Sequence, residues 1–72
     1  MTPKEHAEVL AHEMALDVTD DVHAHLAVAK VASALLEAGL KDRPRAFELA
    51  FDAVMTPYRA FHSDLALARA RP

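Results

Sequence analysis

The 72-residue chain has no cysteine, no tryptophan and only one glycine. Without cysteine, neither a disulfide nor a cysteine-bound zinc can stabilise so short a chain, so helix packing or oligomerisation must do so. The absence of cysteine fits a cytoplasmic protein, and the first residues lack the basic start and apolar run of a secretory signal. Lys30 and two histidines interrupt the central apolar stretch. We therefore expect a soluble, cytoplasmic protein with no membrane span.

The composition favours helix over sheet. Alanine and leucine are abundant, and runs of β-branched residues are missing. A chain of this length forms a single domain near the lower limit for one hydrophobic core. We predict an all-α fold, a small three-helix bundle in which residues 1–72 form one domain. The expected helices cover about residues 3–17, 20–38 and 44–70.

Capping signals mark the ends of these helices. Residues 2–5, Thr-Pro-Lys-Glu, combine a capping threonine, a proline at the first helical position and a glutamate three residues after the cap. A break is expected over residues 17–19, with Thr19 capping the second helix. Gly39 supplies the left-handed residue that commonly ends a helix, and Pro44 is suited to start the third. The first two helices are therefore expected to be antiparallel neighbours.

Pro57 leaves two arrangements open for the C-terminal segment. A proline inside a helix removes one hydrogen bond and typically kinks the helix. We favour one long helix kinked at Pro57, because the apolar spacing keeps its phase across the proline. The alternative is four short helices, with Thr56 capping the last one. The residues that keep this spacing are Phe47, Phe51, Val54, Tyr58, Phe61, Leu65 and Ala68.

The segment from residue 22 to residue 40 carries two apolar seams when it is drawn as a helix. One seam is Ala24, Val28, Val31, Leu35 and Ala38, and the other is Val22, Leu26, Ala29, Ser33, Leu36 and Leu40. The only continuous polar stripe is His23, Lys30 and Glu37. A helix that is apolar over most of its circumference needs cover on several sides. The sequence therefore predicts that this helix contacts at least two others.

An unbroken third helix would overhang the bundle. Its 27 residues would span about 40 Å, against about 28 Å for the 19 residues of the second helix. Large apolar side chains on an overhang indicate an interface. The alternative is that the segment after Pro57 folds back and completes the core. The predicted protein interface is Val22, Leu26, Leu36, Tyr58, Phe61 and Leu65.

No pattern indicates catalysis or a metal site. His12-Glu13 begins like the zinc-protease motif HExxH, but Leu16 replaces the second histidine. The pairs Glu8/His12 and Asp21/His25 are expected to be intrahelical ion pairs. No serine lies on a sharp turn and no glycine-rich loop exists for a phosphate. We predict no catalytic residue, no metal and no cofactor; a histidine-based metal or pH sensor is the alternative.

Charge is unevenly distributed along the chain. Residues 1–40 contain two Lys or Arg against seven Asp or Glu, whereas residues 41–72 contain six against four. These opposite signs favour docking of the two halves, within one chain or between antiparallel partners. Direct nucleic-acid binding is not expected, because Glu48 and Asp52 continue the stripe that starts at Arg45. The face formed by Glu5, Glu8 and His12 suggests instead a possible surface for a basic partner.

The sequence thus predicts a non-enzymatic helical protein-interaction module that self-associates, most simply as a homodimer, and acts as a small regulatory or adaptor protein. Two other functions remain open. The first is a small acidic inhibitor that binds a basic surface of a larger protein or nucleoprotein complex. The second is the histidine-based sensor.

Overall fold

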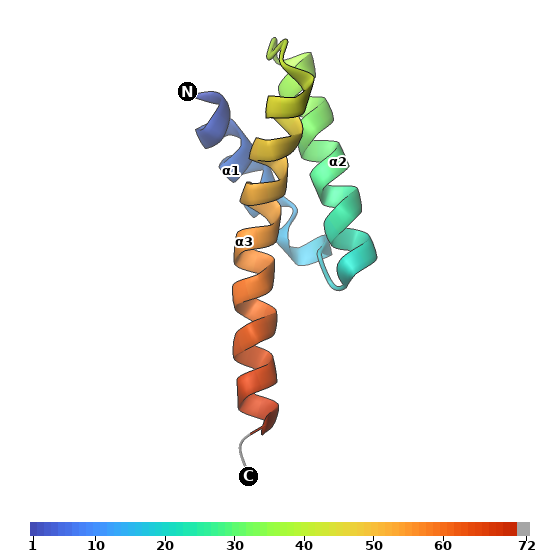
Figure 1. Cartoon of the computed structure of the whole chain (residues 1–72), viewed down its shortest axis with the longest axis vertical. Coiled ribbons are helices and arrows are strands. Elements are labelled where there is room, and N and C mark those ends of the chain that lie inside the picture. The colour runs from blue at the N-terminus through green and yellow to red at the C-terminus, as the bar shows by residue number, and fades with distance from the viewer. Residues whose placement is uncertain (71–72) are drawn as a thin grey trace.

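The fold is all-helical. The computed structural model describes the backbone of residues 1–70 and the side chains of residues 1–61. Helix α1 (Pro3–Glu13) is followed by the short 3-10 helix η1 (Ala15–Asp17), α2 (Asp21–Glu37) and α3 (Arg43–Ala70). Figure 1 shows α3 running past both α1 and α2, and it packs against each of them. The predicted three-helix bundle is confirmed.

Helix α1 begins as predicted but ends earlier than expected. The Thr2 hydroxyl oxygen accepts a hydrogen bond from the Glu5 backbone N–H at 3.2 Å, and the hydroxyl lies 3.0 Å from Glu5 Oε1. The α-helix ends at Glu13 rather than near residue 17, and the chain tightens into η1. The side chains of η1 are exposed, Leu16 at 93%. A further α-helical turn would therefore pack nothing onto the core. Instead the chain forms 3-10 hydrogen bonds from the Asp17 N–H to the Met14 carbonyl and from the Val18 N–H to the Ala15 carbonyl.

Asp20, rather than the predicted Thr19, caps α2. Asp20 Oδ1 accepts from the His23 backbone N–H at 2.9 Å. The Thr19 hydroxyl instead lies 3.1 Å from His23 Nδ1. Both residue types are good caps, so the sequence alone did not separate them. Asp20 becomes the cap because its extended backbone points the carboxylate at the free N–H groups of the first turn of α2.

We expect Asp20→Ala to lower the melting temperature more than Thr19→Ala at neutral pH. The backbone hydrogen bond from His23 is the main cause that lowers the pKa of Asp20 from its ordinary value of 3.8. A lowered folded-state pKa means that the stabilisation is complete above pH 3.8 and is lost as the pH falls through the folded value. Thermal melts followed by circular dichroism should show the difference between the two variants shrinking below that pH. Equal destabilisation at neutral pH would contradict the capping role of Asp20.

Gly39 ends α2 as the sequence predicted. Its φ angle is +116°, a conformation that L side chains rarely adopt. The Leu40 N–H donates to the Leu35 carbonyl and the Gly39 N–H donates to the Leu36 carbonyl, each at 3.1 Å. These two hydrogen bonds together form the Schellman motif. It turns the chain toward α3 and packs Leu40 against the core.

Helix α3 is continuous through Pro57. Asp42 Oδ1 accepts from the Arg45 backbone N–H at 3.1 Å, so the helix starts at Arg43 and Pro44 lies in its first turn. The alternatives of four short helices and of a segment that folds back after Pro57 are both excluded. At about 1.5 Å per residue, 28 residues span about 42 Å, against about 26 Å for the 17 of α2. Figure 1 shows α3 extending well beyond the loop before α2, with its axis inclined in the upper part and upright below.

The core is small and rich in alanine. Buried alanines let the three helices approach closely, but each one removes little apolar area from water. Leu35 and Val31 are the largest fully buried side chains within residues 1–61. The buried residues are Ala7, Ala11, Ala24, Ala27, Val28, Val31, Ala32, Leu35, Ala46, Leu49, Ala50, Val54 and Met55. A core this thin leaves several larger apolar side chains uncovered.

Candidate interaction surface

Among residues 1–61, five large apolar side chains of α2 and α3 are exposed. In α2, Val22 is 67% and Leu26 is 53% exposed. In α3, the exposed fractions are 44% for Phe47, 39% for Phe51 and 64% for Phe61. Single exposed apolar residues are common on protein surfaces, but several on neighbouring helices are typical of an interaction site.

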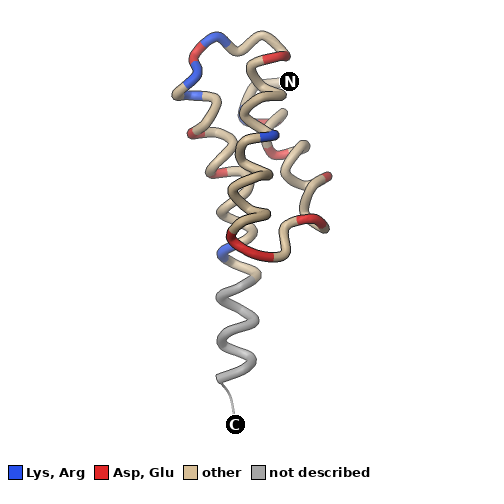
Figure 2. The backbone as a smooth tube through the Cα atoms, turned by 90° about the vertical axis from the view of Figure 1, so that its right-hand side faces the viewer, with Lys and Arg blue, Asp and Glu red and all other residues tan. Residues whose placement is uncertain are grey.

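The second apolar seam of α2 forms its outer face. Ala29 and Ser33 are exposed together with Val22 and Leu26, and Leu36 is half-buried. The first seam, centred on Val31, lies in the core except for the exposed Ala38 at its end. Figure 2 views the bundle from the side of α2, where most of the helix between its two ends carries no charge. Only one of the two predicted seams is therefore covered by the chain itself within the described residues.

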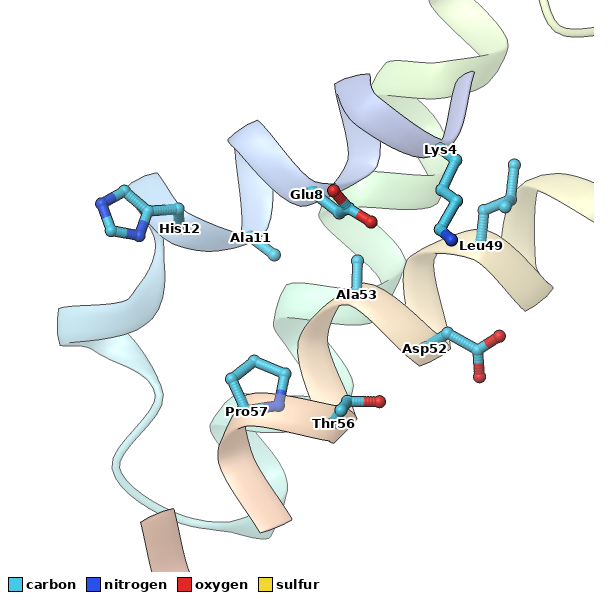
Figure 3. A pocket seen from close by; sticks show the side chains of 9 residues that line it. All are labelled: Lys4, Glu8, Ala11, His12, Leu49, Asp52, Ala53, Thr56 and Pro57. Atoms are coloured by element: carbon cyan, nitrogen blue, oxygen red, sulfur yellow. The ribbon is translucent and has the colours of Figure 1, made fainter. Parts of the chain in front are cut away.

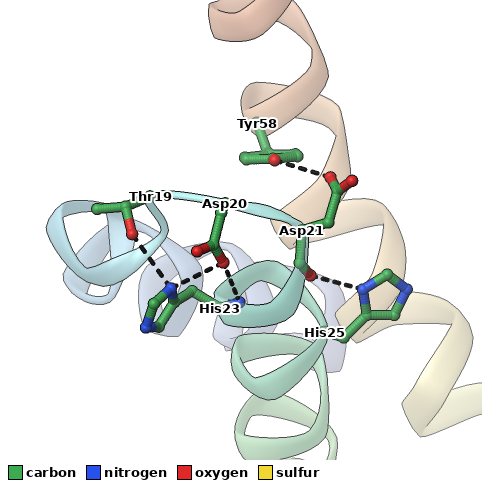
Figure 4. A network of polar contacts seen from close by, with 6 residues as sticks. All are labelled: Thr19, Asp20, Asp21, His23, His25 and Tyr58. Atoms are coloured by element: carbon green, nitrogen blue, oxygen red, sulfur yellow. Dashed lines mark hydrogen bonds and ion pairs between the residues drawn. The ribbon is translucent and has the colours of Figure 1, made fainter.

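Leu36 and Tyr58 pack against the core of their own chain. The Tyr58 hydroxyl donates to Asp21 Oδ1 at 2.8 Å, which joins α3 to the start of α2 (Figure 4). This bond, followed by desolvation and the nearby carboxylate charge, raises the pKa of Tyr58 above its ordinary value. Tyr58 thus contributes to an intramolecular contact rather than to the overhang in which the sequence placed it. The side chain of Leu65, also predicted at the interface, lies outside the described residues.

Phe47 and Phe51 form an apolar edge that the sequence analysis did not assign to the surface. Both follow the apolar repeat of α3, yet Ala46, Leu49 and Ala50 are buried whereas the two phenylalanines are exposed. The Arg59 guanidinium lies 5.4 Å from the centre of the Phe51 ring, a cation–π distance. In the sequence, the four-residue spacing of Ala46 and Ala50 was the signal for the packed face of α3, because small residues at that spacing let helices approach closely.

A polar network surrounds the start of α2 (Figure 4). His23 Nδ1 lies 2.8 Å from Asp20 Oδ1. His25 Nδ1 lies 2.7 Å from the backbone carbonyl oxygen of Asp21, to which it donates. The predicted Asp21/His25 ion pair is therefore replaced by a backbone contact, and the Asp21 carboxylate bonds to Tyr58 instead. Among the described residues, no three His, Asp or Glu side chains are grouped so that they could hold a metal ion.

The predicted acidic face of α1 borders a groove between α1 and α3. The groove has a volume of about 550 Å³. Figure 3 shows the side chains of Glu8 and Lys4 on the same side of α1, whereas His12 points away from α3. Glu5 is exposed but bonds to Thr2 in the helix cap. Glu5, Glu8 and His12 therefore do not form one uniformly acidic patch. The residues lining the groove are Lys4, Glu8, Ala11, His12, Leu49, Asp52, Ala53, Thr56 and Pro57.

The two ends of α2 differ in charge. Basic residues gather in and after the loop that precedes α3, and acidic residues gather around the loop that precedes α2 (Figure 2). The basic group is Lys41, Arg43 and Arg45, and the acidic group is Asp17, Asp20 and Asp21. Glu37, Asp42 and Glu48 offset these three basic charges, so the difference in net charge between the two ends comes from the acidic group. The bundle is therefore electrostatically polar along α2.

Comparison with protein-family models, with curated proteins and with solved structures finds no match for this chain. The helical arrangement alone defines its class, a small all-α three-helix bundle with a long final helix. Within the part of the chain that the structure describes, no helix has the length and apolar character needed to cross a membrane.

Proposed function

We propose that the protein is a non-enzymatic helical interaction module that self-associates as a homodimer and acts as a small regulatory or adaptor protein. The observation that carries this proposal is the exposed seam on α2, with Val22 and Leu26 more than half exposed. The exposed Phe47 and Phe51 on the neighbouring helix add to the same argument. Burying apolar area of this kind is the main driving force for protein association.

The small core supports the same proposal. More than half of the buried residues are alanines, so the area buried within one chain is low for its length. Domains of this size commonly gain stability from oligomerisation. The absence of cysteine supports a cytoplasmic location.

Light scattering after size-exclusion chromatography tests self-association directly. We expect the molar mass to rise from near 7.9 kDa in dilute solution to twice that value as the concentration increases from micromolar toward millimolar. The melting temperature should rise over the same range, because mass action stabilises an associating protein. A mass of one chain at every concentration would contradict the proposal.

A further inference from the structure

We propose that two copies of the chain pair through the outer face of α2, with the two α2 helices antiparallel and the two-fold axis between Ala29 and Ser33. This inference rests on the proposed self-association and specifies its geometry. The occupant of the exposed seam is a second copy of the same surface, as a two-fold interface requires.

The spacing of the seam fixes the register. Its residues alternate at intervals of four and three, the pattern of a helix–helix seam. When two such seams run in opposite directions about a point between Ala29 and Ser33, Leu26 lies opposite Leu36 of the second copy. Ala29 then lies opposite Ser33, and Val22 lies opposite Leu40. Small residues at the centre let the helices approach closely, and larger residues pack on both sides.

Charge selects the antiparallel direction. In this register, Asp21 lies level with Lys41 of the second copy, in the loop after α2, whereas Asp20 lies level with Asp42. A parallel pair would instead bring the acidic ends together, along with the like ends of the two helix dipoles. The two Lys30 side chains, near the axis, also face a like charge, and both are exposed and long enough to separate.

The aromatic edge of α3 fits the same two-fold axis. Tyr58 contacts Asp21 of α2, and Phe51 and Phe47 precede Tyr58 by two and three helical turns. Both phenylalanines therefore lie on the side of α3 nearest α2, yet both remain exposed. Since α3 runs antiparallel to α2, they are level with about residues 28–32, the middle of the seam. Phe47 of one copy is thus expected near Phe51 of the other.

Engineered cysteines test the register, because the natural chain has none to interfere. Leu26→Cys and Leu36→Cys chains, one carrying a short extension to distinguish their masses, are mixed in a glutathione redox buffer. We expect the mixed disulfide between the two variants to predominate over either disulfide with itself. The second pair is Val22→Cys with Lys41→Cys. Both positions are exposed, so this pair tests the register even if replacing the half-buried Leu36 perturbs folding. Val9→Cys, exposed on α1, measures random collision.

The outcomes separate this inference from the proposed function. Predominant self-disulfides of Leu26→Cys would indicate parallel helices and overturn the antiparallel arrangement while leaving self-association intact. The wild type could instead dimerise while neither mixed pair forms more disulfide than Val9→Cys does. That result would place the interface elsewhere and overturn the assignment of the interface to α2. A wild-type chain that stays monomeric by light scattering would overturn both proposals.

Discussion

Leu26→Glu is expected to prevent the proposed dimerisation and to leave a folded monomer. Leu26 is 53% exposed in one chain, so a symmetric interface that covers it in both copies buries about one whole leucine side chain. Such burial contributes about 1.5–3 kcal/mol, and burying a glutamate in its place adds a desolvation penalty. A loss of about 2–3 kcal/mol corresponds to a dissociation constant raised roughly 30- to 150-fold. Within a single chain the change is mild, because the side chain is already in contact with water.

The measurement is molar mass against concentration, with circular dichroism to verify the fold. Val9→Glu is the matched control, since it places the same charge at an exposed apolar position of α1. Val9→Glu should associate like the wild type, whereas Leu26→Glu should remain at the mass of one chain. An unchanged dissociation constant for Leu26→Glu would rule out the outer face of α2 as the interface. Equal weakening by both variants would indicate an effect of net charge alone.

The ends of the helices were predictable wherever one residue type is strongly required. Gly39 is the only glycine, and the φ of +116° found there is what a glycine after a helix predicts. Thr2 and Pro3 likewise mark the start of α1. At the start of α2, by contrast, Thr19 and Asp20 are both good caps, and the path of the chain after η1 selects Asp20. Sequence signals alone do not distinguish adjacent residues with the same capping ability.

The exposed apolar surface was predictable only in part. The second seam of α2 was predicted to lie at an interface, and its Val22 and Leu26 are exposed. The repeat in α3 did not reveal that Phe47 and Phe51 are exposed, because close helix packing favours the neighbouring alanines in the core. Tyr58 was misplaced for another reason. Its hydroxyl reaches Asp21, a contact between residues 37 positions apart that local periodicity does not reveal.

Leu35→Ala is expected to remove most of the stability of the fold. Leu35 is 1% exposed and is one of the two largest fully buried side chains described. Its truncation typically costs about 2–5 kcal/mol, depending on how far the neighbours collapse into the cavity. At 0.05–0.15 kcal/mol per residue, a chain of this length has a total stability of roughly 4–11 kcal/mol. The alanines of the core offer no long side chains that can move to fill the cavity, so the cost should lie toward the upper part of the range.

Urea denaturation at a fixed protein concentration measures this loss, and Leu16→Ala is its matched control. Leu16 is 93% exposed in η1, so the same change of side chain there should alter the free energy of unfolding by less than about 0.5 kcal/mol. The melting temperature of Leu35→Ala should fall by about 10 °C or more. Because an unfolded chain presents no ordered α2 face, the same variant should also dimerise poorly. A cost for Leu16→Ala as large as that for Leu35→Ala would contradict the assignment of the core, and with it the assignment of the α2 seam to the surface.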